Sequence, residues 1–280
     1  MTRAIFSRKG FDSAYGGGVS PVLPDGAMQS IGIPEAGSGI AYGDVQTPRG
    51  SLLELMHELG INRYRENKQW YPLVAKSEVH LDPDLHISAR ARHHAWRPVF
   101  GQCEGAQTVL RNRKVAKGDL FIFYGNFRRT VDVGGSLKFI GKTFHAIFGY
   151  MSVGDIVTVD GSTTLPWCAE HPHLVNRKRK NNTLYLASNV ATFSGRKMSG
   201  AGIVSFDERR ILSSTYERPS LWRLPSFFHP DISGRTMSNH LSKDWTLNDE
   251  TALLQTKSPG QEYVVDATAE MIDWAAQVLR

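Results

Sequence analysis

The sequence GDLFIFYGNFR at residues 118–128, together with FHAIFGY at residues 144–150, decides the fold of this chain. Leu120–Tyr124 and Ala146–Tyr150 are continuous apolar and aromatic runs bounded by glycine, a pattern typical of buried β-strands. One Gly-Asp pair precedes the first run and another follows the second, and such pairs favour turns. These runs predict an α+β protein whose centre is a mostly antiparallel sheet or a small barrel, with helices on its flanks.

Polar and aromatic residues lie next to these runs, where they are expected to form the rim of the sheet. An aromatic face at such a rim can stack on a flat ring, while amide and guanidinium groups hydrogen-bond to the edge of that ring. The alternative is that the aromatic residues belong to the core, and the sequence leaves both interpretations open. The rim residues are Trp96, Arg97, Gln102, Asn126 and Arg128.

The composition is that of a globular protein, with 280 residues of which 41% are hydrophobic and 21% charged. We expect a single domain over residues 1–280, because no linker or internal repeat divides the sequence. No apolar run approaches the roughly 18 residues of a membrane span, and Met1–Lys9 leads into no apolar signal segment. Cys103 and Cys168 are too few for a disulfide scaffold. These features predict a cytoplasmic protein without a membrane partner.

The formal net charge of +6 favours an anionic partner. The positive charge is clustered, notably within residues 111–117 and in the RKRK block of residues 177–180. Clustered lysine and arginine supply the sequence-independent part of nucleic-acid binding. A solvated loop is the alternative for the block, whose members are Arg177, Lys178, Arg179 and Lys180.

A glycine-rich loop follows the expected first strand, Arg3–Phe6. It reads SRKGFDSAYGGG at residues 7–18, and its glycines allow backbone amides to approach a ligand closely. It is not a Walker motif, since no Gly-Lys-Ser/Thr ends it. Asp12 lies inside this loop and is a candidate functional carboxylate. Asp25 belongs to a Pro-Asp-Gly tripeptide, which favours an ordinary turn.

The sequence HLDPDLH at residues 80–86 places two histidines and two aspartates on one face if the segment is extended. Such residues are metal ligands, and His-x-Asp is part of the facial triad of iron oxygenases, which a distant histidine completes. Pro83 argues against a regular strand, and Asp-Pro-Asp is also common in turns. A metal site, one functional carboxylate and a structural turn all stay open. The possible ligands are His80, Asp82, Asp84 and His86, with His171 and His173 as a distant pair.

Three helices are expected from their caps and apolar stripes. Ser51–Glu54 is a capping box that begins the first, Cys103–Val115 forms the second, and Thr268 caps the third. The remaining expectations are strands at residues 182–187 and 261–266, a flexible loop at residues 195–202 and a packed aromatic segment at residues 221–228.

Motifs spread over nearly the whole chain carry a resemblance to a known family. They are SRKGFDS (7–13), PDG (24–26), HLDPDL (80–85), WRPVFGQ (96–102), GDLFIFY (118–124), FGY (148–150), HPH (171–173), NTLY (182–185), WRLP (222–225) and GQE (260–262). With them the chain resembles the nucleotide modification associated domain 3 family, which is linked with modified DNA bases in bacteria and phages. Its central strand pattern also looks like the PUA and EVE barrels, which bind modified bases.

The resemblance implies a DNA glycosylase that removes glucosylated hydroxymethylcytosine from phage DNA as an antiviral defence. Such an enzyme flips its target nucleotide out of the duplex, and a carboxylate stabilises the positive charge that develops on the sugar. Asp12 is the first candidate for that carboxylate, followed by Asp84 and Asp25. The resemblance requires no metal or other cofactor. It leaves the recognised modification, the strand preference and the oligomeric state undefined.

The same resemblance assigns binding roles to the rim and to the basic residues. Trp96, Phe100, Tyr124 and Phe127 are expected to stack on the base, and Gln102 and Asn126 to hydrogen-bond to its edge. Arg8, Lys9, Arg128 and the 177–180 block are expected to bind phosphates. A non-catalytic reader of modified bases is the alternative, because it needs the pocket but no carboxylate. A metal-dependent DNA-modifying enzyme is a third hypothesis, and it requires the 80–86 segment to meet His171 or His173.

Overall fold

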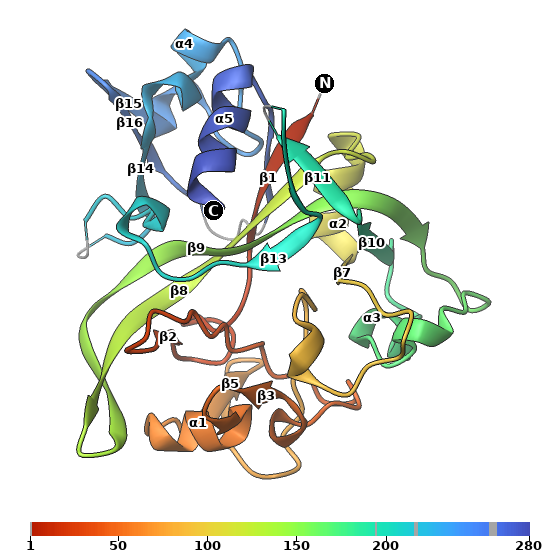
Figure 1. Cartoon of the computed structure of the whole chain (residues 1–280). Coiled ribbons are helices and arrows are strands. Elements are labelled where there is room, and N and C mark those ends of the chain that lie inside the picture. The colour runs from red at the N-terminus through yellow and green to blue at the C-terminus, as the bar shows by residue number, and fades with distance from the viewer. Residues whose placement is uncertain (1, 194, 216–217, 258–261) are drawn as a thin grey trace.

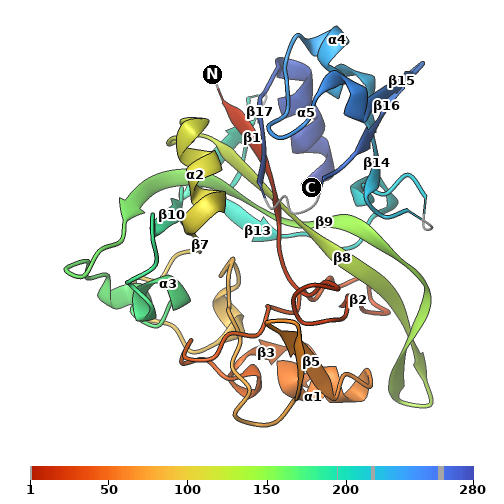
Figure 2. The ribbon, with the colours of Figure 1, turned by 180° about the vertical axis from the view of Figure 1, so that it is seen from behind.

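The structure is a computed structural model that describes residues 2–193, 195–215, 218–257 and 262–280. One large mixed sheet organises the molecule, and its main path runs in the order β17-β1-β8-β9-β10-β7 (Figures 1 and 2). Two short strands join it at the side: β2 pairs with β8, and β13 pairs with β9. The strands are β1 (Arg3–Arg8), β2 (Ser20–Val22), β7 (Val99–Gln102), β8 (Leu120–Val133), β9 (Ser136–Thr158), β10 (Thr183–Ala187), β13 (Ala201–Ile203) and β17 (Glu262–Asp266).

The sheet confirms the predicted α+β class with a mostly antiparallel centre. Only β1 and β2 run parallel to their neighbour β8, and the other pairs in this sheet are antiparallel. Its path starts at β17 and ends at β7, and within the described residues these two strands do not pair with each other. The sheet is therefore open, and the barrel that the sequence offered as an alternative is not formed.

The predicted central strands are the inner part of a long hairpin, β8–β9, which crosses the middle of the molecule (Figure 1). Its turn is Gly134-Gly135, where both residues have positive φ, a conformation that glycine adopts without strain. The hairpin extends beyond the apolar runs because Arg129–Val133 still pairs with residues 136–140.

Smaller elements surround the sheet. The three predicted helices are present as α1, α2 and α5, and α1 has the predicted capping box: the Ser51 hydroxyl accepts from the Glu54 amide, and the Glu54 carboxylate accepts from the Ser51 amide. Thr268 caps α5. The helices are α1 (Leu52–Glu58), α2 (Glu104–Asn112), α3 (Pro172–Val175), α4 (Pro230–Ser233) and α5 (Ala269–Val278). The small sheets are β3 (Gln46–Thr47) with β4 (Gly50–Ser51), β5 (Arg63–Glu66) with β6 (Gln69–Pro72), β11 (Val190–Phe193) with β12 (Arg196–Ser199), and β14 (Leu221–Pro225) with β16 (Thr251–Gln255) and β15 (Trp245–Asn248).

Two of these elements change the predicted boundaries. The prediction of a flexible loop at residues 195–202 is wrong, because Arg196–Ser199 pairs with β11 and Ala201 begins β13. The closing strand is confirmed from Glu262 onward, and Gln261 lies outside the described residues. The aromatic segment 221–228 contains β14 and packs into the core, as expected.

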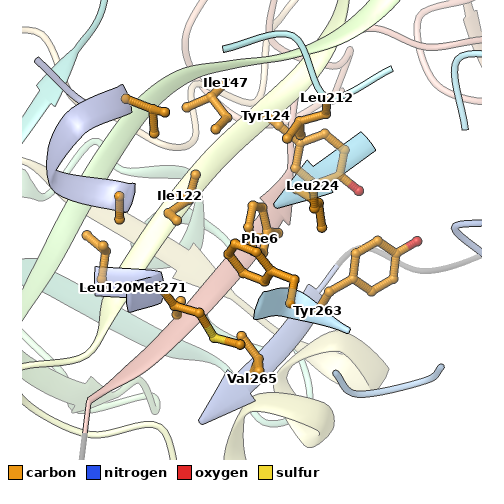
Figure 3. Close-up of a cluster of buried hydrophobic side chains, with 14 of the residues drawn as sticks. Phe6, Leu120, Ile122, Tyr124, Ile147, Leu212, Leu224, Tyr263, Val265 and Met271 are labelled. Atoms are coloured by element: carbon orange, nitrogen blue, oxygen red, sulfur yellow. The ribbon is translucent and has the colours of Figure 1, made fainter. Parts of the chain in front are cut away.

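Both faces of the sheet are covered, which explains why its central strands read as continuous apolar runs. Neighbouring side chains on a strand point to opposite faces. Ile122 and Tyr124 of β8 enter a core beneath α5 and β14–β16 (Figure 3), whereas Phe121 and Phe123 enter a second core on the other face. A third cluster lies under α1 and contains Phe11.

Candidate functional site

A cavity of about 850 Å³ lies beside the large sheet, between the loop at residues 81–89, the loop at residues 27–32 and β13. Met28, Leu85 and Phe148 give it apolar walls, and Asp82, Asp84 and Trp96 give it polar and aromatic ones. Cavities of about 300–1,000 Å³ lined in this way are typical of small-molecule sites.

A smaller cavity of about 200 Å³ adjoins it and shares Asp84 and Trp96. The Arg92 guanidinium donates to both oxygens of Asp84, at 2.7 and 2.5 Å, and lies over the Trp96 ring at 4.6 Å. Burial raises the pKa of Asp84, and the Arg92 charge opposes that shift. Asp84 is thus a buried carboxylate with its partner already in place.

Three histidines surround the carboxylate of Asp82, whose side chain is only 3% exposed. The Nε2 atoms of His80 and His173 lie 3.5 and 4.0 Å from its Oδ2 atom. The Nε2 atom of His171 lies 3.3 Å from Oδ1, which also accepts a hydrogen bond from the Gly101 amide at 2.8 Å. The Oδ2 atom of Asp82 therefore faces His80 and His173, and its Oδ1 atom faces His171 and the Gly101 amide.

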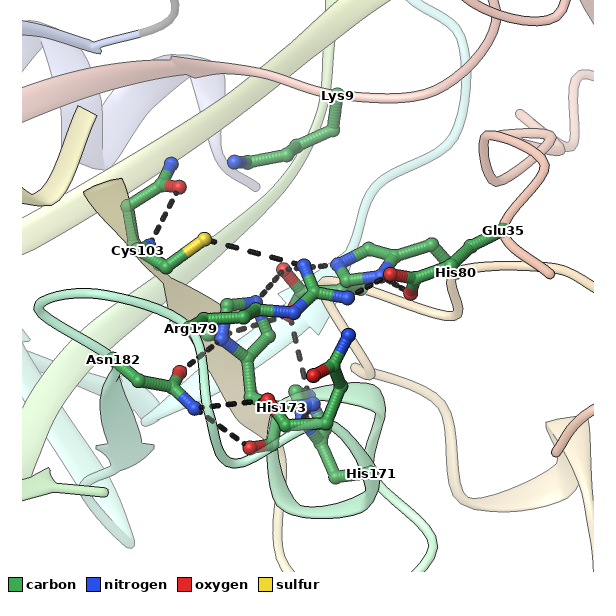
Figure 4. A network of polar contacts seen from close by, with 12 residues as sticks. Lys9, Glu35, His80, Cys103, His171, His173, Arg179 and Asn182 are labelled. Atoms are coloured by element: carbon green, nitrogen blue, oxygen red, sulfur yellow. Dashed lines mark hydrogen bonds and ion pairs between the residues drawn. The ribbon is translucent and has the colours of Figure 1, made fainter. Parts of the chain in front are cut away.

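The outer nitrogens of two of these rings have their own partners (Figure 4). His80 Nδ1 lies 2.5 Å from Glu35 Oε2, and the other oxygen of Glu35 forms an ion pair with Arg179. His173 Nδ1 lies 2.5 Å from Asn182 Oδ1. Each ring is therefore held from outside and presents Nε2 toward Asp82.

The charge state of this cluster follows from its burial and its neighbours. Burial alone would raise the pKa of Asp82, but hydrogen bonds from His171 and His80, and the positive charge of these rings when they are protonated, outweigh it and hold that pKa well below its usual range. Burial lowers the pKa of His173 to about 3. At neutral pH, Asp82 is a carboxylate that faces a neutral imidazole.

Another buried carboxylate, Glu262, lies at the start of β17. Its Oε1 atom accepts from Ser7 at 2.9 Å, from Gln102 at 2.6 Å and from Lys9 at 3.3 Å. The Lys9 ammonium also lies 4.3 Å from the centre of the Phe100 ring. Burial raises the pKa of Glu262, while Lys9 opposes that shift. These contacts join the glycine-rich loop to the sheet.

The aspartates that the sequence singled out lie in three different settings. Asp12 accepts from the backbone amides of Ala14 and Tyr15 at 2.7 and 2.8 Å and pairs with Arg8 at 2.8 Å. Asp25 is exposed and accepts from Ala27 N at 2.9 Å. Neither Asp12 nor Asp25 lines the two cavities, whereas Asp84 lines both.

Of the predicted base-binding residues, Trp96 is the one that lines both cavities. The side chains of Phe100, Tyr124 and Phe127 are at most 1% exposed and pack in the two main cores. These three rings have the core role that the sequence left open as the alternative. The Gln102 amide donates to the Glu262 carboxylate. The Arg97 guanidinium lies over the Trp167 ring at 5.5 Å. Asn126 is half-buried and lies opposite His145 in the hairpin.

The basic block divides into inward and outward side chains. Arg177 donates to the Leu174 carbonyl oxygen at 2.9 Å, and Arg179 turns inward to Glu35. Lys178 and Lys180 are exposed. Outside the block, Arg128 donates to the Gly141 carbonyl oxygen at 2.8 Å.

The sequence pointed to most of the histidine cluster but missed its outer partners. Glu35 belongs to a glycine- and proline-rich segment without periodicity, and Asn182 was expected only as the beginning of a strand. The two histidine motifs, at residues 80–86 and 171–173, were the available signal, and the structure brings them together. Of the residues that the sequence left open as possible metal ligands, Asp84 and His86 face other partners, Arg92 and Ser88.

The fold and the site define an α+β domain with a buried histidine–carboxylate cluster beside a ligand-sized cavity. The model of the nucleotide modification associated domain 3 family matches residues 3–266, so the chain belongs to that family. This membership associates the protein with nucleotide modification. Comparison with curated proteins and comparison with solved structures gave no significant match. Across the described residues, no helix has the length and apolarity needed to cross a membrane.

Proposed function

We propose that this protein is a DNA glycosylase that excises a hypermodified cytosine, such as glucosylated hydroxymethylcytosine, and leaves an abasic site. The observation that carries the proposal is the cavity of about 850 Å³ with the ionised Asp82 in its wall. A flipped nucleotide with an added sugar needs a cavity of this class. Membership of a family associated with nucleotide modification supports the choice of substrate.

The mechanism follows from the charge that develops on the sugar. As the N-glycosidic bond breaks, its electron pair leaves with the base and C1′ becomes positively charged. The negative charge of Asp82 stabilises that centre while the base contacts Trp96 and the apolar walls. A water oxygen then bonds to C1′, and its proton is transferred to the departing base. Asp84 is less suited to this step because both of its oxygens accept hydrogen bonds from Arg92.

The exposed part of the basic block supplies the contact with the DNA backbone. Lys178 and Lys180 have side chains free to reach phosphates, whereas Arg177 and Arg179 are engaged within the protein. The block follows α3, which carries His173, so a backbone bound there passes close to the cluster. A phosphate path beside a base cavity is the arrangement that base flipping requires.

The test is release of free base from DNA containing glucosylated hydroxymethylcytosine, with unmodified DNA as a parallel substrate. Asp82→Asn keeps the shape of the side chain and removes its charge, so we expect base release to fall roughly a hundredfold or more. Asp25→Asn is the matched control, because Asp25 is exposed in a turn away from the cavity, and it should release base at the wild-type rate.

A non-catalytic reader is the competing function, and the same experiment separates the two. A reader binds the modified DNA tightly and releases no base, in the wild type or in any variant. That result would exclude the glycosylase. Base release that is unchanged in Asp82→Asn and lost in Asp12→Asn would move the catalytic role to the glycine-rich loop.

A further inference from the structure

We infer that His80, Asp82 and His173 form a binding site for a divalent transition-metal ion beside the cavity. The ligand atoms are the two Nε2 atoms and Asp82 Oδ2, and one ligand atom from each residue lies within 4.8 Å of the others. Two imidazoles and one carboxylate are a ligand set for Zn²⁺ or Fe²⁺ that leaves coordination positions for water or substrate. The inference deepens the proposed function, because the site is the same: with an ion on Oδ2, Asp82 would act by holding the ion, and the ion would supply an activated water for the attack on C1′.

Hydrogen bonds on the outer side of the cluster fix the proton position on the two rings. The side-chain amide of Asn182 donates through Nδ2 to the His173 carbonyl oxygen at 2.8 Å, so its Oδ1 faces His173 Nδ1 as an acceptor. His173 Nδ1 must therefore carry the proton. The Glu35 carboxylate faces His80 Nδ1 in the same way. In their neutral forms, both rings present an unprotonated Nε2 atom toward Asp82.

The two oxygens of the Asp82 carboxylate have different surroundings. Asp82 Oδ1 accepts from the Gly101 amide, and His171 approaches the same oxygen through Nε2. His171 Nδ1 accepts from the His173 amide at 3.3 Å, so its proton is on Nε2, the atom that faces Asp82. Oδ2 is left facing the two lone pairs of His80 and His173. Three electron-rich atoms that face one another repel unless a cation lies between them.

The distances between the ligand atoms and the outer partners of the rings also fit a metal site. The separations of 3.5 and 4.0 Å between Oδ2 and the Nε2 atoms are close to the roughly 3.4 Å that separates tetrahedral ligands about 2.1 Å from a metal. Metal-binding histidines commonly donate their other N–H to a carboxylate or a carbonyl oxygen, which fixes the ring and its tautomer. Glu35 and Asn182 make those contacts here.

The position of the site gives the ion access to a ligand. Asp82 lines the large cavity, and His171 lines the smaller one. In the sequence, Pro83 counted against a metal site in HLDPDLH, because it interrupts the strand that would place the ligands on one face. That objection does not apply, since His80 and Asp82 lie outside the named strands and the third ligand comes from the start of α3.

The competing explanation is a proton on one of the rings in place of the metal. To separate the two, we would dialyse the whole protein against Zn²⁺, Fe²⁺ (without oxygen), Mn²⁺ or Mg²⁺ and measure the bound metal per chain. We expect one equivalent of a transition metal and weaker binding of Mg²⁺, which prefers oxygen ligands. Loading with Co²⁺ should give visible d–d absorption from a site with nitrogen ligands.

Variants localise the site. His173→Gln and Asp82→Asn should lose the stoichiometric metal and the Co²⁺ spectrum, and His94→Gln, at an exposed histidine, should keep both. Asn182→Ala and Glu35→Gln should lower metal affinity about 10- to 100-fold, because they act on the ligands through the outer nitrogens. Circular dichroism of each variant establishes that a loss of metal is not a loss of fold.

The inference is overturned if the folded wild type retains no metal and gives no Co²⁺ spectrum, or if His173→Gln and Asp82→Asn bind metal as the wild type does. Metal binding is measured without DNA, so it is independent of base release. A protein that binds the ion but releases no base refutes the glycosylase alone. A protein that releases base with no bound metal refutes the metal site alone.

Discussion

Replacing Gly101 with alanine tests how tightly the sheet holds the histidine cluster. A Cβ atom at Gly101 would lie 2.2 Å from His173 Cδ2 and 2.5 Å from its Cγ, whereas carbon atoms in contact are about 3.5–4.0 Å apart. The ring cannot withdraw freely, because Asn182 holds its Nδ1 atom and Asp82 lies at its Nε2 side. The ring or the backbone of β7 must therefore move by more than about 1 Å.

The expected loss is about 1–3 kcal/mol of unfolding free energy, the usual range for an overpacked interior. Gly105→Ala is the matched control, four residues later in α2. Its Cβ meets nothing within 4 Å, and alanine favours a helix over glycine by up to about 1 kcal/mol. Gly105→Ala should therefore leave stability unchanged or raise it, so the two variants shift in opposite directions.

Guanidinium unfolding followed by tryptophan fluorescence gives both values under one set of conditions. If Gly101→Ala is as stable as the wild type, the close packing of His173 against β7 is not a constraint and the reasoning fails. The same variant should also bind Zn²⁺ more weakly, since its ring is displaced. Unchanged Zn²⁺ affinity with lowered stability would mean that the backbone, not the ring, has moved.

Three further outcomes are expected. Arg92→Ala should lower the unfolding free energy by about 3–5 kcal/mol, because it leaves the buried Asp84 carboxylate unpaired; adding Asp84→Asn should recover part of that loss in chemical denaturation. Burial lowers the pKa of His145 to about 3. Between about pH 6.5 and 3, the unfolded chain therefore binds a proton that the folded protein does not. The free energy of unfolding should decrease by up to about 1.4 kcal/mol for each unit by which the pH is lowered. His145→Gln should reduce that slope by this amount in urea titrations at pH 4, 5 and 6. Replacing Lys178 and Lys180 with alanine should reduce the salt slope of DNA binding by about 1.8, measured by fluorescence anisotropy, and an unchanged slope would remove both from the phosphate path.

The fold was predictable where both periodicity and burial were strong. Leu120–Tyr124 is apolar at every position because cores cover both faces of β8, so its strand was evident without any partner. The outer half of the hairpin, beyond Phe127, has exposed positions and is defined by pairing with β9. β12 is short and largely exposed, so its residues carried no strand pattern, and pairing with β11 decides its conformation.

The site was predictable only as fragments. The sequence offered His80, Asp82 and the 171–173 pair as possible ligands, but which of them meet depends on residues between and around them. Gly101 in β7 is the point of contact, since its amide binds Asp82 and its missing side chain admits His173. The sequence around Asn182 does not indicate that its side chain fixes the tautomer of His173, nine residues away.

The cluster therefore forms only when β7 and β10 are paired in the observed register. Leu184 lies opposite Gly101, and Asn182 directly precedes β10. A slip of one residue would place a side chain against His173 and turn the neighbouring residues to the other face. Because β7 is an end strand of the sheet path, its local opening should require less energy than global unfolding.

A metal ion bound to the cluster would raise the free energy of that opening. At a free concentration of 100 times Kd, the gain is about 2.7 kcal/mol, or roughly a hundredfold slower amide exchange. Hydrogen exchange with and without Zn²⁺ should show this protection in β7 and at the start of β10, while β14 and β16, which lie in a separate sheet, serve as the internal reference. Equal protection of both regions would mean that the ion stabilises the whole fold, and no protection in β7 would mean that the edge strand opens without releasing the ion.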